Sequence, residues 1–139
     1  EQTGNPSWLY SVVNGATTIW ERWNSYIAET GEFGAVSMNS FNHYAYGAIG
    51  QWMFGEILGI TAGRPGYRSA ELRPHYGGTM TWARGWHDTP LGKIDSSWRI
   101  TDGVFRYECK LPDGMPGHLT MPNGDEYSFM GRIIAECRI

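Results

Sequence analysis

The chain has 139 residues, of which 41% are hydrophobic and 18% are charged, and this balance favours a folded chain over disorder. The formal net charge of −3 offers no basic field for nucleic-acid binding. No apolar run of about 18 residues occurs, so no membrane-spanning helix is expected.

Three helices are predicted in the first part of the chain, over residues 5–14, from Thr18, and from around Ser40 to residue 57. Asn5 is expected to cap the first helix, and Pro6 suits its first helical position. A glycine-containing loop is expected between the second and third helices.

The third predicted helix has apolar residues at the spacing of one helix face, namely Phe41, Tyr44, Ala45, Ala48, Ile49, Trp52, Met53 and Ile57. Gly47, Gly50 and Gly55 each weaken this helix by about 1 kcal/mol relative to alanine. Such glycines suggest that another helix or a ligand approaches closely. Gly59 is expected to end the helix.

From Tyr67 onward the apolar residues alternate, which predicts β-strands. One face of each strand is marked by a set of apolar residues: Met80, Trp82 and Trp86; Ile94, Trp98 and Ile100; Phe105, Tyr107, Cys109 and Leu111; Ile133, Ala135, Cys137 and Ile139. The pair Asp102-Gly103 predicts a two-residue hairpin turn. Six to eight short antiparallel strands with regular turns predict a β-sandwich.

The chain gives no sequence signal for a metal or a cofactor. Cys109 and Cys137 lack the local pairing of a zinc or redox motif, and whether they meet across strands is left open. His75, His87 and His118 also lack metal-ligand spacing. No metal and no cofactor are therefore expected.

Two aromatic segments carry the strongest functional signal. The first, Gly15-Ala-Thr-Thr-Ile-Trp-Glu-Arg-Trp23, sets Glu21 between two tryptophans, and the second is Met38-Asn-Ser-Phe-Asn-His-Tyr-Ala-Tyr-Gly47. A carboxylate among aromatic walls suits sugar chemistry. Both segments resemble the last part of the catalytic barrel of bacterial α-L-rhamnosidases, glycoside hydrolase family 78.

The resemblance implies an α+β chain with two parts. Residues 1–61 correspond to the last helices of an (α/α)6 catalytic toroid, and residues 62–139 to the antiparallel β-sandwich that follows it. The segment Pro65-Gly66-Tyr67, followed by Pro74 and Gly77-Gly78, resembles the family's linker into the sandwich.

Glu21 has two interpretations. Thr18-Ile-Trp-Glu21 fits a helix capping box, in which the glutamate returns to the cap residue's N–H. The resemblance instead implies that Glu21 is the general base of an inverting glycosidase. Inversion needs a second carboxylate, the general acid, about 6.5–9.5 Å away. In the family that acid lies far upstream, in a segment outside this sequence.

The substrate implied by the resemblance is a rhamnosyl glycoside, or L-rhamnose as the product. His43, Asn42, Trp20 and Trp23 are the residues expected to bind the sugar, His43 by a hydrogen bond to a hydroxyl. The structural alternatives are helix capping by Asn39 or Asn42 and core packing by at least one of the two tryptophans.

Two other functions compete with this hypothesis. The chain could be a non-catalytic carbohydrate-binding or interaction module, or part of a different helical-toroid glycosidase. Three apolar helices cannot all be buried against one small sandwich, so a broad apolar face is left over. This face predicts self-association or contact with an upstream part of the enzyme, and neither nucleic acid nor a membrane is an expected partner.

Overall fold

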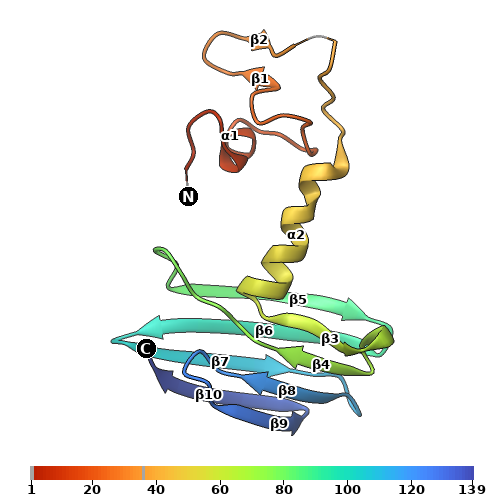
Figure 1. Ribbon diagram of the computed structural model, residues 1–139, viewed down its shortest axis with the longest axis vertical. Coiled ribbons are helices and arrows are strands. Elements are labelled where there is room, and N and C mark those ends of the chain that lie inside the picture. The colour runs from red at the N-terminus through yellow and green to blue at the C-terminus, as the bar shows by residue number, and fades with distance from the viewer. Residues whose placement is uncertain (1, 36) are drawn as a thin grey trace. The chain divides into compact units, whose positions relative to one another are not determined.

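The computed structural model describes residues 2–35 and 37–139 (Figure 1). The chain divides into two compact units, Glu1–Ile49 and Gly50–Ile139. The first unit holds short helices and a two-stranded hairpin, and the second holds two four-stranded sheets. The predicted α+β fold class is confirmed.

The described residues of the first unit form short elements: α1 (Trp8–Val13), β1 (Tyr26–Ile27), β2 (Glu32–Phe33) and the 3-10 helix η1 (Tyr44–Ala48). The first predicted helix is present but shorter than expected. Its cap is Ser7 rather than Asn5, because the Ser7 hydroxyl accepts the Tyr10 N–H at 3.0 Å.

The helix predicted from Thr18 is wrong. Residues 18–25 form bends and turns, because Thr18 and Glu21 hydrogen-bond groups outside the segment. The Thr18 hydroxyl donates to the Phe41 carbonyl, and the Glu21 N–H donates to the Ser40 carbonyl at 2.8 Å. Contacts with a segment some 20 residues away have therefore outweighed the local preference for a capped helix.

The third predicted helix is confirmed from Tyr44 onward, from η1 through α2 (Ile49–Trp52) to the π-helix η2 (Met53–Ile57). Its cap is His43 rather than Asn39 or Asn42, since His43 Nδ1 accepts the Ala45 N–H at 3.4 Å. None of the helices in residues 2–35 and 37–139 is long and apolar enough to cross a membrane.

Tyr10 ties α1 to the β1–β2 hairpin. Its buried hydroxyl donates to Glu29 Oε2 and accepts the Ala28 N–H, both at 2.7 Å. The hydrogen bond to Tyr10 lowers the pKa of Glu29, and the same bond raises the pKa of Tyr10. This link joins the helix to the hairpin through two hydrogen bonds of one side chain.

Tyr10→Phe is expected to return the pKa of Glu29 toward its usual 4.5 and to loosen the hairpin. Because the folded-state pKa of Glu29 is lowered, its stabilisation is present above 4.5 and is lost as pH falls through that lowered pKa. The raised pKa of Tyr10 keeps the bond intact up to about pH 10. Titration of the Glu29 carboxyl by NMR tests this, with the exposed Tyr44→Phe as the control. An unchanged Glu29 titration in Tyr10→Phe would contradict the assignment.

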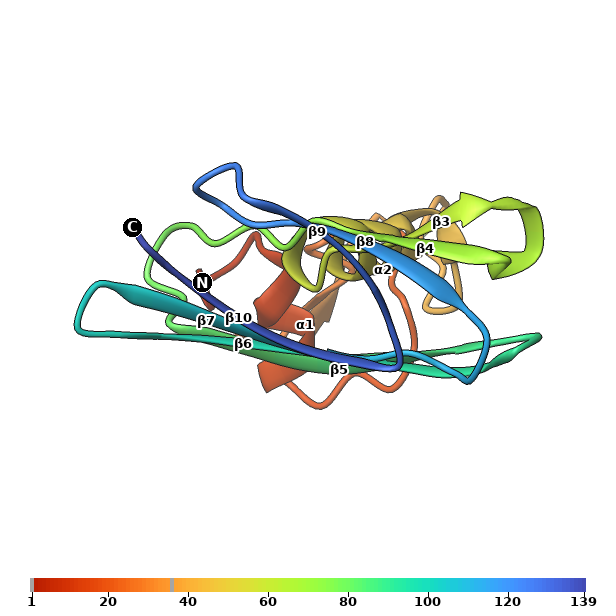
Figure 2. The ribbon, with the colours of Figure 1, turned by 90° about the horizontal axis from the view of Figure 1, so that it is seen from below.

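The second unit is a sandwich of two sheets, which Figure 2 shows as two layers. One sheet has the order β10-β7-β6-β5 and the other β3-β4-β8-β9. The strands are β3 (Ile60–Arg64), β4 (Ser69–Leu72), β5 (Trp82–Thr89), β6 (Gly92–Thr101), β7 (Val104–Lys110), β8 (Pro116–Thr120), β9 (Glu126–Met130) and β10 (Arg132–Arg138). The predicted sandwich is present, but β4 and β8 pair in parallel, with Ala70 opposite Gly117.

The core lies between the two sheets and uses the predicted alternation of β7, whose Phe105, Tyr107 and Cys109 are fully buried. Trp98 is 3% exposed, stacks on Phe105, and donates its indole N–H to the Ile57 carbonyl at 2.7 Å. The helical end is thereby fixed to the sandwich core within the second unit. Trp82 and Trp86, in contrast, lie on the outer face of β5 at 65% and 58% exposure.

Two predicted turn positions have the backbone that glycine favours. Asp102 and Gly103 both have positive φ, 50° and 73°, in the hairpin between β6 and β7. Gly59 follows η2 with φ 72°, and a Cβ there would lie 2.3 Å from the Pro74 nitrogen. A side chain at position 59 is therefore excluded by both conformation and space.

Cys109 and Cys137 are buried free thiols. They sit on the paired strands β7 and β10 but at different register positions, opposite Ile133 and Phe105 respectively. Burial raises the pKa of Cys109 to about 12, which leaves it protonated and unreactive at neutral pH.

Candidate sugar site

The two aromatic segments of the sequence lie side by side in the first unit. The His43 N–H donates to the Ile19 carbonyl at 2.8 Å, and the Glu21 N–H donates to the Ser40 carbonyl at 2.8 Å. These bonds hold residues 19–21 against residues 40–43 like two short strands. Glu21 and His43, separated by 22 positions in the sequence, are thus brought to one place in the fold.

Glu21 is fixed by a second bond to the same residue. Its Oε2 accepts the Ser40 N–H at 2.8 Å, so backbone and side chain of Glu21 both bind Ser40. The capping-box interpretation of Glu21 is wrong, because this carboxylate does not return to the N–H of Thr18. Oε1 has no hydrogen-bond partner among the described residues, and the side chain is half-buried.

The two tryptophans beside Glu21 have different surroundings. Trp20 is 9% exposed and packs edge-on against Phe41, with ring centroids 5.4 Å apart. Trp23 is 41% exposed and stacks on Tyr46 at 5.6 Å. Trp8 of α1 meets the same Tyr46 edge-on at 5.4 Å. Trp20 therefore serves packing, and Trp23 belongs to an aromatic surface that is partly open.

His43 and Asn42 lie at the start of η1. The imidazole of His43 stacks on the exposed ring of Tyr44 at 5.9 Å, and its Nδ1 accepts the Ala45 N–H. Asn42 is exposed, and its backbone N–H donates to the Ser40 hydroxyl at 3.1 Å. Because Nδ1 accepts a backbone N–H, Nε2 is the ring nitrogen that remains available to a ligand.

A buried turn supports the Trp23 side of this site. The Ser25 hydroxyl accepts the Arg22 N–H, and the Ser25 carbonyl accepts both the Gly34 N–H and the Asn39 side-chain amide. A Cβ at Gly34 would lie 2.7 Å from the Asn24 carbonyl oxygen. The backbone can approach this closely only because residue 34 is glycine.

Glu21 is the carboxylate that hydrogen bonds hold against the second aromatic segment. The hydrogen bonds of Glu21 are with Ser40, and neither Glu29, bound to Tyr10, nor Glu32, bound to Thr30, shares them. In residues 2–35 and 37–139, no group of three or more His, Cys, Asp or Glu side chains could hold a metal ion. Such a site can supply one general base or acid, together with aromatic and imidazole contacts to a ligand.

Two residues of the site were not singled out from the sequence. Tyr46 links Trp8 and Trp23, and Ser40 fixes the Glu21 carboxylate through a backbone N–H. The aromatic spacing of residues 41–46 was the available signal for Tyr46. A backbone donor leaves no signal in the residue type, so Ser40 could not be found in this way.

Comparison with known families matches the two parts of the chain separately. Residues 1–57 match the bacterial alpha-L-rhamnosidase 6 hairpin glycosidase domain, and residues 59–133 match the bacterial alpha-L-rhamnosidase C-terminal domain. The helical part thus matches a glycosidase domain, and the sandwich matches the domain named as C-terminal. The chain belongs to the bacterial α-L-rhamnosidase family.

Individual relatives agree with this family. The chain is 43% identical over 117 residues to an alpha-L-rhamnosidase of Streptomyces avermitilis, covering 84% of this chain and 11% of that protein. It is 42% identical over 123 residues to an alpha-L-rhamnosidase of Formosa agariphila, covering 88% and 13% respectively. The chain therefore spans only about a tenth of these relatives' length.

Two solved structures share the fold over 99% of this chain. The Streptomyces avermitilis alpha-L-rhamnosidase complexed with L-rhamnose matches with a TM-score of 0.86 at 32% identity, over 15% of its own length. The native alpha-L-rhamnosidase of Aspergillus terreus matches with a TM-score of 0.90 at 32% identity, over 16% of its length.

Proposed function

We propose that this chain contributes the general base, Glu21, to an inverting α-L-rhamnosidase that removes terminal α-L-rhamnose from glycosides. The observation that carries the proposal is the pair of hydrogen bonds between Glu21 and Ser40, which holds the carboxylate beside the segment of His43. Family membership supports the substrate class. In this proposal the general acid comes from a part of the enzyme outside these 139 residues.

In this proposal Glu21 acts through its second oxygen. Oε2 stays bound to the Ser40 N–H, which holds the carboxylate in one orientation, while Oε1 takes a proton from the attacking water. The water then adds to the anomeric carbon from the face opposite the leaving group. The general acid gives its proton to the glycosidic oxygen as that bond breaks, so the configuration inverts.

In this proposal the sugar packs against Trp23, and His43 and Asn42 face the sugar's hydroxyl groups. The exposed indole of Trp23 offers an apolar wall that accepts the 6-methyl group of rhamnose. Trp20 acts indirectly, because its burial against Phe41 fixes the backbone between Glu21 and Ile19. A sugar with a 6-hydroxyl needs a polar partner at that wall, so glucosides are expected to bind worse.

The proposal is tested by substrate preference in a complete enzyme that contains this sequence. An aryl α-L-rhamnoside is expected to be hydrolysed at least about tenfold faster than the matching aryl α-glucoside, judged by kcat/KM. His43→Ala is expected to raise KM more than it lowers kcat, because a hydroxyl contact is lost in ground and transition states alike. A preference for the glucoside, or unchanged kinetics in His43→Ala, would refute the assigned substrate or the assigned contact.

The exposed helical residues motivate a further expectation, about association. Val12 and Val13 of α1 are each 61% exposed, and Trp52, Met53 and Phe54 are 41–50% exposed. We expect the 139-residue chain to self-associate through such apolar surface when no other part of the enzyme covers it. Gel filtration should show a concentration-dependent increase in size, whereas a monomer at all concentrations contradicts the expectation.

A further inference from the structure

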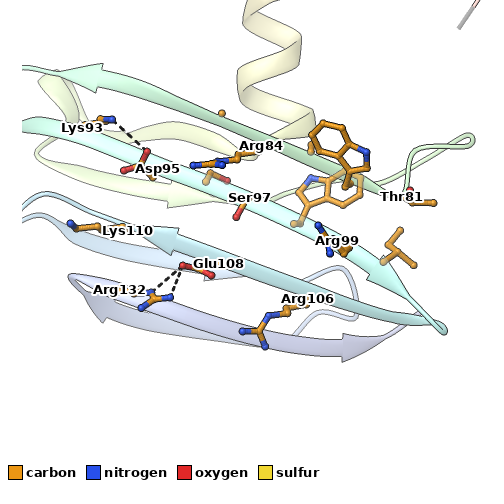
Figure 3. Close-up of a pocket in the computed structure, with 16 residues that line it drawn as sticks. Thr81, Arg84, Lys93, Asp95, Ser97, Arg99, Arg106, Glu108, Lys110 and Arg132 are labelled. Carbon is orange, nitrogen blue, oxygen red and sulfur yellow. Dashed lines mark hydrogen bonds and ion pairs between the residues drawn. The ribbon is translucent and has the colours of Figure 1, made fainter.

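The outer face of the sheet β10-β7-β6-β5 concentrates positive charge. A shallow hollow on this face is lined by six of the chain's 11 basic residues, Arg84, Lys93, Arg99, Arg106, Lys110 and Arg132, against two acidic ones, Asp95 and Glu108 (Figure 3). The whole chain has a net charge of −3, so the basic residues are segregated rather than evenly spread. A face of this kind attracts anions.

The positive charges of this face are only partly neutralised by the protein. Arg132 donates twice to Glu108 Oε1, at 2.7 and 3.1 Å, and Arg106 pairs with Glu136. Arg84, Arg99 and Lys110 have no ion-pair partner among the described residues.

One cross-strand pair on this face is unfavourable by itself. Arg99 of β6 lies directly opposite Arg106 of β7, and like charges in that position destabilise a sheet. Glu136 offsets part of this repulsion through its ion pair with Arg106, and an anion bound beside Arg99 would offset more of it.

Two exposed indoles run along the edge strand of the same face. Trp82 and Trp86 of β5 are 65% and 58% exposed, and Arg84 lies between them on the same side of the strand. The strand rise separates the two indoles by about 13 Å. Lys93 Nζ lies 5.5 Å from the ring centre of Trp86. The guanidinium group of Arg84 thus lies between two aromatic rings along β5.

We propose that this face binds an acidic polysaccharide whose charges are uronate carboxylates. The indoles stack on sugar rings, and the guanidinium groups bind the carboxylates. Carboxylate is the anion that Arg side chains of this face already bind within the protein, because Arg132 donates two N–H bonds to Glu108 Oε1 and Arg106 pairs with Glu136. The exposed aromatic and charged side chains form a row along one strand, which suits an extended polymer. The centre of a protein interface would be apolar and poor in charged residues.

This binding face is separate from the proposed site of hydrolysis, because none of its residues belongs to the site around Glu21. The face lies wholly within β5, β6, β7 and β10 of the second unit. Binding and hydrolysis can therefore fail independently, and Glu21→Gln is expected to keep full polysaccharide affinity.

Calorimetric titration of the 139-residue chain with polygalacturonate oligomers tests the proposal. Dextran serves as the neutral polymer and dextran sulfate as the sulfated one. We expect binding of polygalacturonate, none of dextran, and weaker binding of dextran sulfate. Raising the salt from about 0.1 M to about 1 M shortens the screening length from about 10 Å to about 3 Å and should weaken the binding.

Variants locate the binding on the face. Trp82→Ala and the double change Arg84→Gln with Arg99→Gln are each expected to weaken binding at least about tenfold. The matched controls, Met130→Ala and Arg73→Gln, change exposed residues outside this sheet and should stay within about twofold.

Four results would overturn the proposal. These are no binding of polygalacturonate, equal binding of dextran, tighter binding of dextran sulfate, and unchanged affinity in the face variants. A fifth comes from a complete enzyme containing this sequence. If Trp82→Ala and Arg99→Gln lower its melting temperature clearly more than the two controls do, the face is covered by protein instead.

Discussion

Replacing Glu21 by Gln in a complete enzyme is expected to lower kcat for an aryl α-L-rhamnoside by about 10²–10⁴-fold, the usual contribution of a general base. Folding should change by less than about 0.5 kcal/mol, because the Gln carbonyl still accepts the Ser40 N–H. Release of the aryl alcohol, followed by absorbance, measures the rate, and urea unfolding measures the stability.

The matched control for this change is Glu32→Gln. Glu32 is exposed and accepts a hydrogen bond from Thr30 at 3.1 Å, and it shares no hydrogen bond with Glu21 or Ser40. Its kinetics should be unchanged. A Glu21→Gln enzyme that keeps its normal rate would remove Glu21 from the role of base, whatever its effect on folding.

Trp98→Ala is expected to give the largest loss of stability in the second unit, about 3–5 kcal/mol. The indole is 3% exposed and stacks on Phe105 at 5.3 Å, so its removal leaves a cavity between the sheets. It also leaves the Ile57 carbonyl without its hydrogen bond. Since domains are stable by only about 5–15 kcal/mol, the variant will unfold at much lower urea concentration.

Two further variants separate the causes of this loss. Trp98→Phe keeps an aromatic ring against Phe105 but loses the bond to Ile57, so it should cost less than alanine. Trp82→Ala removes an exposed indole from the outer face and should cost about 0.5 kcal/mol or less. If Trp98→Ala unfolds normally but no longer binds the sugar, the second unit rather than the first would carry the sugar site.

The parts of the fold that the sequence predicts correctly are those set by neighbouring residues. Asp102 and Gly103 can both adopt positive φ, which is what a two-residue hairpin requires. The alternation Phe105, Tyr107, Cys109 predicts a strand with one buried face, and all three are buried. Gly59 ends its helix for the same local reason.

The parts that the sequence predicts wrongly depend on distant partners. Thr18 and Glu21 have the spacing of a helix cap, but their hydrogen bonds go to Phe41 and Ser40. The parallel pairing of β4 with β8 joins Ala70 to Gly117 across a long separation and leaves no periodic signal.

The same limit applies to the candidate site. The aromatic pattern around Glu21 and His43 is visible in the sequence, as is the likeness to a family. Which tryptophan is buried is not visible, because Trp20 and Trp23 are equally apolar and only contact with Phe41 or Tyr46 separates them. Alternation also fails to tell the inner face of β5 from the outer face that carries Trp82.

The most direct measurement of the proposed role of Glu21 is chemical rescue of Glu21→Ala in a complete enzyme. Azide is an anion and carries no proton that a base must remove. It can therefore replace water as the nucleophile on the face opposite the leaving group. With an aryl α-L-rhamnoside as substrate, we predict that azide restores turnover and that NMR identifies β-L-rhamnosyl azide as the product. No rescue by azide, or a product of α configuration, would contradict the assignment of Glu21 as the general base of an inverting reaction.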